Sequence, residues 1–158
     1  MTFSLLALLS ACAPAISKQS LRKADASLTF QELIKDPERY KGKMMALGGE
    51  IISNAVREGE TWMEVLQRPL NWQLKPKDTD LSYGRFLVHF AEFRDPAVYA
   101  PGRKITVLGK VQGKKILPLQ EIIYSYPVLI PYESHLWKPE TWGGPFFYLG
   151  IEVGGMIR

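Results

Sequence analysis

Cysteine and histidine are scarce in this sequence. Its 158 residues include one cysteine and two histidines. One cysteine excludes an intramolecular disulfide, and three such side chains are too few for a structural zinc site made of cysteine and histidine, which takes four ligands. A chain of this length forms one domain and buries about two thirds of its unfolded surface, so its core needs neither kind of support.

Long apolar runs and N-terminal charge are also missing. Residues 1–11 read MTFSLLALLSA, and the first basic residue is Lys18. Eleven residues of helix cover about 16 Å, whereas crossing a bilayer takes roughly 20 residues. We therefore interpret residues 1–11 as the apolar part of a secretory signal. Such a signal normally begins with a Lys or Arg, and the lack of one favours a true start upstream over a signal that relies on the amino terminus alone.

The single cysteine follows this apolar run directly. Leu9, Ser10, Ala11 and Cys12 resemble the lipobox of bacterial lipoproteins. The thiol of Cys12 is the nucleophile that accepts the diacylglyceryl group as a thioether, and cleavage before Cys12 would free an amino group that takes a further acyl chain. Several acyl chains at ~0.8 kcal/mol per buried CH₂ make a stable anchor. The alternative is a buried structural cysteine in an N-terminal apolar strand.

The residue after the cysteine predicts where the lipoprotein goes. In lipoproteins of Gram-negative bacteria, an Asp at this position tends to retain the product in the inner membrane, and here the residue is Ala13. The prediction is a chain anchored in the outer membrane by Cys12, with the covalent diacylglycerol and N-acyl chain as its only added groups. Its expected partners are outer membrane lipid, the lipoprotein processing and sorting machinery, and other envelope proteins.

The residues after the cysteine are small, polar and basic. We interpret residues 12–27 as the lipidated cysteine and a flexible tether, because they show no apolar period. Lys18, Arg22 and Lys23 in this segment are able to touch anionic head groups, and a solvated linker is the alternative.

Residues 28–131 are predicted to form the folded domain. The chain has 11 prolines and 13 glycines spread along it, which favours short strands and turns over long helices. Thr29 and Glu32 have capping-box spacing and predict one short helix. The Gly48-Gly49 pair inside the first strand suggests a bulge or sharp coil. Strands are expected over residues 44–53, 61–70, 84–91 and 104–111, with a hairpin at Gln112-Gly113 and one or two closing strands over 115–123 and 126–130.

This order predicts a mainly β fold. We expect a small five- to six-stranded antiparallel barrel, similar to the oligonucleotide/oligosaccharide-binding (OB) fold, with a short N-terminal helix. A flat sandwich is the alternative. Residues 132–158 form an aromatic C-terminal extension rich in Gly and Pro, either packed on the domain or exposed for a partner. Its candidate interaction surface consists of Trp137, Trp142, Phe146, Phe147 and Tyr148.

Five blocks of this sequence stand out by their order and spacing, namely Leu9–Cys12, Tyr40–Ser53, Gly84–Tyr99 with Asp95-Pro96, Thr106–Gly113 and Trp137–Tyr148. Together they resemble the Slp family of starvation-inducible outer membrane lipoproteins. The resemblance implies a lipid-anchored envelope protein without known catalytic activity, associated with starvation and with envelope stability. It supplies no active site and no ligand.

The residues themselves predict neither a catalytic site nor a metal site. The best catalytic assembly that the sequence offers joins His89 to Glu92 or Asp95 and to a serine, Ser82 or Ser125, and a packed strand histidine is the simpler interpretation. No phosphate-binding loop or dinucleotide motif is present. We therefore predict a non-enzymatic protein.

Two binding functions are weighed beside this prediction. An OB-like face would stack nucleotide bases on aromatic side chains next to basic ones, for which the chain offers Trp62, Arg68, Tyr83, Arg85 and Phe93. A net charge of +4 is modest, and a periplasmic lipoprotein meets little nucleic acid, so we expect no nucleic-acid partner. A periplasmic module that binds a glycan or peptidoglycan fragment is the retained alternative.

Overall fold

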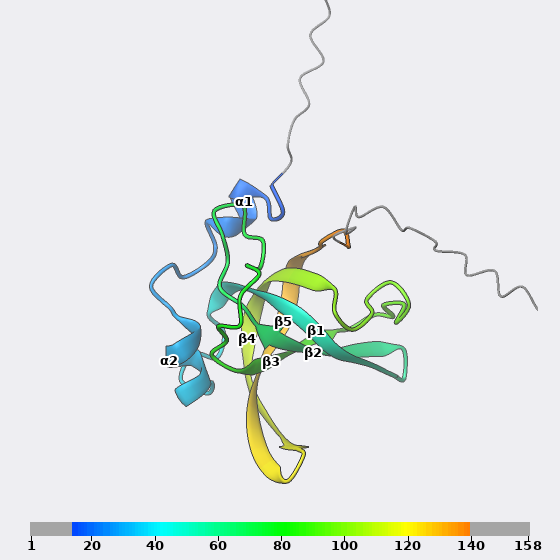
Figure 1. The fold of residues 1–158 in the computed structure, drawn as a ribbon. Coiled ribbons are helices and arrows are strands. Elements are labelled where there is room, and N and C mark those ends of the chain that lie inside the picture. Colours follow the sequence, from blue (N-terminus) through cyan, green and yellow to red (C-terminus); the bar gives the residue numbers. More distant parts are fainter. Residues whose placement is uncertain (1–13, 140–158) are drawn as a thin grey trace, which may run out of the picture.

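The described part of the chain forms a single sheet of five strands (Figure 1). The structure is a computed structural model, and it describes residues 14–139. Two short helices come first and the strands follow, which confirms the mainly β class. The elements are α1 (Lys18–Leu21), α2 (Phe30–Lys35), β1 (Met44–Arg57), β2 (Glu60–Gln67), β3 (Arg85–Phe90), β4 (Lys104–Leu119) and β5 (Ile122–Leu136).

The strand pairing closes into a ring in the order β1-β2-β3-β5-β4. Four of the pairings are antiparallel, and the fifth, between β3 and β5, is parallel. The expectation of a purely antiparallel arrangement is therefore wrong at this pair. The reason is one of parity, because strand direction cannot alternate all the way around a ring with an odd number of members.

The core lies inside this ring. In β2 every second residue is buried, so Met63 and Val65 point inward while Trp62 and Glu64 point outward. On α2, Phe30 packs edge-on against the core at 6.0 Å from the ring centroid of Phe86. The predicted capping box of this helix is confirmed, with Thr29 and Glu32 bonded in both directions. Among residues 14–139, no helix is long and apolar enough to span a membrane.

The glycine pair in β1 lies where other chain segments approach closely. A Cβ on Gly49 would stand 1.9 Å from the carbonyl oxygen of Leu66 on β2, and one on Gly48 would stand 2.6 Å from Leu70 Cδ2. The register irregularity expected at these glycines occurs later, between Ile51 and Ser53. The pair therefore lets neighbouring segments touch the backbone of β1, while the bulge that follows it bends the strand.

The hairpin between β4 and β5 turns at Gln120 and Glu121, and the expected turn at Gln112-Gly113 is wrong. Gly113 sits instead at a bulge within β4, with a φ of 117°. The carboxylate of Glu38 occupies the space beside it and accepts the N–H of Lys114 at 2.9 Å. Because β4 and β5 are not interrupted there, they continue as a two-stranded arm beyond the ring (Figure 1).

The residues expected to form a flexible tether lie against the sheet from Ile16 onward. Ile16 is 1% exposed, and the helix α1 follows it. The N–H of Ser17 donates to Glu133 on β5 at 2.7 Å, and the N–H of Asp25 donates to the carbonyl of Met44 at 2.8 Å. The segment has no apolar period, yet one buried apolar side chain and the hydrogen bonds at its two ends hold it on the sheet.

Candidate functional site

A shallow cleft of about 230 Å³ lies on the outer face of the sheet, beside the β4–β5 arm. It is lined by the outward residues of β1, β2 and β3 and by side chains of the arm. Trp62 and Glu64 come from β2, Leu87 from β3, and Lys115 and Tyr126 from the arm. Two groups of contacts are formed here, a polar cluster around Glu64 and an aromatic stack around Trp62.

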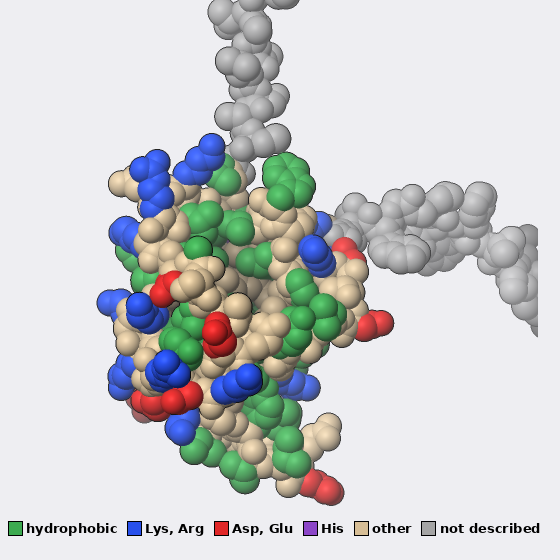
Figure 2. All heavy atoms as spheres, turned by 90° about the vertical axis from the view of Figure 1, so that its left-hand side faces the viewer, with side chains coloured by type: hydrophobic (Ala, Val, Ile, Leu, Met, Phe, Trp, Pro, Cys, Tyr) green, Lys and Arg blue, Asp and Glu red, His purple; other side chains and the backbone are tan. Residues whose placement is uncertain are grey.

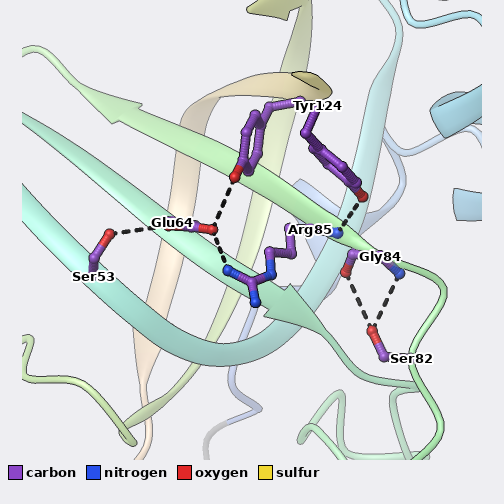
Figure 3. A network of polar contacts seen from close by, with 7 residues as sticks. Ser53, Glu64, Ser82, Gly84, Arg85 and Tyr124 are labelled. Carbon is purple, nitrogen blue, oxygen red and sulfur yellow. Dashed lines mark hydrogen bonds and ion pairs between the residues drawn. The ribbon is translucent and has the colours of Figure 1, made fainter. Parts of the chain in front are cut away.

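The polar cluster is centred on the carboxylate of Glu64 (Figure 3). Its Oε1 accepts from Arg85 Nη1 at 2.7 Å and from the hydroxyl of Tyr126 at 3.1 Å, and its Oε2 accepts from Ser53 Oγ at 3.2 Å. The hydroxyl of Tyr124 accepts the backbone N–H of Arg85 at 2.9 Å. The cluster therefore joins β1, β2, β3 and β5 through side chains on the outside of the ring.

Charge and burial within this cluster shift two pKa values upward. Burial first, and then the adjacent carboxylate of Glu64, which opposes a second negative charge, together raise the pKa of Tyr126 to about 12. The hydrogen bond to Glu64 also raises the pKa of Arg85. At neutral pH the cluster thus holds a carboxylate, a guanidinium and a neutral phenol, each satisfied by another.

Tyr126 should make the protein lose stability in alkali. The pKa of Tyr126 is raised in the folded state. Its contribution to the free energy of unfolding is therefore complete below pH 10.0, the ordinary pKa, and disappears as the pH rises from there to about 12. We expect a loss on the order of 2 kcal/mol over this interval, measured by urea unfolding at successive pH values. In Tyr126→Phe this part of the loss should be absent, and parallel curves for the two proteins would contradict the assignment.

The aromatic stack covers both faces of Trp62. The ring of His89 lies 4.0 Å from the indole with an interplanar angle of 10°, and Lys115 Nζ lies 3.8 Å from the indole centroid. Two groups this close cannot share one face, so they occupy opposite sides. His89 Nε2 in turn contacts Glu60 Oε2 at 2.8 Å. Lys115 therefore ties the arm to β2 through a cation–π contact.

The catalytic assembly considered from the sequence does not form. His89 pairs with Glu60, while Asp95 accepts the N–H of Ala97 at 2.8 Å and Ser82 exchanges hydrogen bonds with the backbone of Gly84. Within residues 14–139, no three His, Cys, Asp or Glu side chains gather as a metal site would require.

The set of residues considered for base stacking is largely engaged elsewhere. Arg85 is paired with Glu64, and Arg68 Nη2 lies 3.8 Å from Glu50 Oε2. Trp62 is covered on both faces, as described. Stacking of bases between aromatic and basic side chains needs these groups free.

The lipidation residues and most of the aromatic extension lie outside the described residues. These are Leu9, Ser10, Ala11, Cys12, Ala13, Trp142, Phe146, Phe147 and Tyr148. Trp137 is described and is half-buried on the domain. Its Nε1 donates to Thr106 Oγ1 at 3.0 Å, and its carbonyl accepts from Arg103 Nη2 at 2.7 Å.

Sequence reasoning missed the Glu64 cluster, although part of its signal was present. A strand was expected over residues 61–70, and the alternation of β2 puts Trp62 and Glu64 on one face of it. Their partners Tyr126 and Lys115 come from the arm, and the misplaced hairpin hid the pairing that brings them together. To predict the cluster from the sequence, the correct register of β4 on β5 would have been needed.

Comparison with known proteins identifies a family. The profile of the outer membrane lipoprotein Slp family matches residues 9–148. An uncharacterized protein of Haemophilus influenzae is 33% identical over 100 residues, which cover 63% of this chain and 54% of that protein. The uncharacterized lipoprotein YeaY of Escherichia coli is 27% identical over 94 residues, covering 58% of this chain and 48% of the relative. The match thus spans about half the length of these relatives, and no solved structure matches the chain.

Proposed function

Because the chain belongs to the Slp family of outer membrane lipoproteins, we propose that it is a non-enzymatic envelope protein anchored in the outer membrane by an acylated Cys12. Its role on this proposal is structural or stress-related and is exerted from the membrane surface. The family is not known as a family of enzymes, which agrees with a cleft whose polar groups bind one another.

The observation that carries this proposal is the early docking of the chain after Cys12. Ile16, four positions later, is already buried against the sheet. Four extended residues span at most about 14 Å, so an anchor at Cys12 would hold the domain directly on the membrane. A tether through the whole segment to residue 27 would have let the domain move far from the surface; the docked segment favours a protein that works at the membrane.

The ring of strands supports a finer proposal for the fold, an OB-type barrel. An OB fold is a five-stranded Greek-key barrel, and this chain has five strands whose pairing closes. The retained alternative function, glycan or peptidoglycan binding on the outer face, has less support. Sugar stacking needs an open aromatic face, and both faces of Trp62 are covered by His89 and Lys115.

The β4–β5 arm supports contact with envelope proteins as the way in which the role is exerted. Three isoleucines near its tip are exposed, namely Ile116, Ile122 and Ile123. Exposed apolar side chains gathered on a projecting hairpin favour a protein contact over a purely solvated surface. The lipid, the processing machinery and the sorting machinery remain the proposed partners of the anchor.

Replacing Cys12 tests the anchor. In Cys12→Ser the hydroxyl cannot form the thioether, so the protein should lose the mass of the acyl chains and disappear from the outer membrane fraction. Intact-mass measurement and membrane fractionation of the native host provide the two readouts. Ser10→Ala, which keeps a small residue in the lipobox, should behave as the wild type. A Cys12→Ser protein of unchanged added mass, still in the outer membrane, would refute the proposal.

A further inference from the structure

We infer that the end of the molecule that carries α1 is a membrane-binding surface for anionic phospholipid head groups. We define this surface, the α1 face, by Lys18, Arg22, Lys23 and Trp72. The inference rests on the proposed anchor and goes beyond it, because an acyl chain alone does not determine which side of the domain meets the lipid. The partner to which the inference commits is a phospholipid leaflet containing phosphatidylglycerol.

Two segments form the α1 face, and both are fixed to the outer side of the β4–β5 pair. The N–H of Ser17 donates to Glu133, and Thr106 Oγ1 donates to the carbonyl of Leu74 at 2.6 Å. Thr106 pairs with His135, two residues from Glu133 along β5, so the attachment points lie about 7 Å apart. In Figure 1 the connection from β2 to β3 rises to the same end of the molecule as α1.

Trp72 projects from a turn that is fixed by hydrogen bonds. The side chain is 88% exposed. Beneath it, the N–H of Asn71 donates to the carbonyl of Lys75, and Asn71 Oδ1 accepts the N–H groups of Gln73 and Lys75, all at 2.9 Å. A tryptophan held outward by such a turn is suited to a membrane–water interface, where the ring meets apolar groups and the indole N–H stays hydrated.

The charge of the α1 face suits an anionic leaflet. Lys18 and Arg22 are exposed, and neither forms an ion pair with an acid of residues 14–139. Lys23 Nζ bonds the hydroxyl of Tyr132 and lies 4.0 Å from its ring centroid. Figure 2 shows Lys and Arg side chains gathered at this end and down one side of the molecule. Basic residues near an anionic membrane surface each add to binding.

The anchor and the α1 face lie at the same end of the chain. An acylated Cys12 within about 14 Å of Ile16 brings α1 to the lipid before any other element. The β4–β5 arm then points away from the membrane, because Figure 1 places its tip at the opposite end from α1. Membrane and protein contacts are thereby separated on the molecule.

Quenching of tryptophan fluorescence by brominated lipid tests the inference. The mature lipidated protein, its acylation checked by intact mass, is reconstituted in vesicles of phosphatidylethanolamine and phosphatidylglycerol with and without bromine on the acyl chains. Trp72 is one of four tryptophans, so the wild type should lose up to about a quarter of its emission and Trp72→Phe clearly less. Trp62→Phe, which removes a tryptophan covered by protein, should instead raise the quenched share to about a third, because Trp72 is then one of three tryptophans.

A second variant tests the charges. Neutralising all three basic residues by Lys18→Gln, Arg22→Gln and Lys23→Gln should reduce the quenching by about half, as should vesicles without phosphatidylglycerol. Equal quenching in wild type and Trp72→Phe would overturn the inference. Emission of Trp72 without vesicles that is typical of a ring buried in protein would also overturn it, because residues 140–158 or a second copy would then cover the ring. A protein lacking acyl mass would instead refute the anchor, so the two failures are distinguishable.

Discussion

Replacing Gly49 by alanine is expected to unfold the domain. A Cβ at this position would stand 1.9 Å from the carbonyl oxygen of Leu66 and 2.9 Å from Val65 Cγ1. Both belong to β2, which is held between β1 and β3 and cannot retreat without breaking two ladders. We expect the free energy of unfolding to fall by more than roughly 4 kcal/mol, which is close to the whole stability of many domains.

A second glycine supplies the control for this prediction. Gly42 has a φ of 85°, and nothing lies within 4 Å of its added Cβ. Gly42→Ala should therefore cost only the strain of a left-handed alanine, about 1 kcal/mol. Urea unfolding followed by tryptophan fluorescence compares the two variants. A Gly49→Ala protein as stable as Gly42→Ala would show that β1 and β2 are not in the contact described.

Removing the carboxylate of Glu64 should cause the second largest loss. Glu64→Ala leaves the guanidinium of Arg85 and the hydroxyl of Tyr126 without their partner, and Tyr126 is buried. Breaking a buried pair by deleting one member costs about 3–5 kcal/mol, and the partial exposure of this pair reduces the expectation to about 2–3 kcal/mol.

An exposed ion pair provides the comparison. Glu92 contacts Arg94, but its side chain is 67% exposed, so Glu92→Ala should change stability by less than about 0.5 kcal/mol. Both variants are measured by urea unfolding at neutral pH. Equal small effects would mean that the Glu64 cluster is a surface contact without a structural role.

The parts of the fold that were predicted correctly depend on local patterns. The Thr29 capping box and the strand expected from residue 61 are set by residues a few positions apart, and both agree with the structure. The hairpin was misplaced because Gly113 resembles a turn glycine, whereas its positive φ serves a bulge beside the distant Glu38. Only the tertiary contact distinguishes the two uses.

The candidate sites also differ in whether a local sequence pattern predicts them. The lipobox is a contiguous motif, so the sequence suffices to propose Cys12 as the anchor. The Glu64 cluster takes its members from four strands, and the α1 face combines a helix with the turn at Asn71. The docking of Ile16 was missed because one apolar residue in a polar segment carries no periodic signal.

The β4–β5 arm leaves two strand edges open beyond the ring. Within residues 14–139, β4 and β5 pair there only with one another, and the arm displays exposed isoleucines, a combination that invites other chains to add a strand. Lys114, Lys115 and Pro118 lie along this part of β4. Charge and a missing N–H discourage edge-to-edge stacking, so the arm can display apolar side chains while resisting aggregation through its open edges.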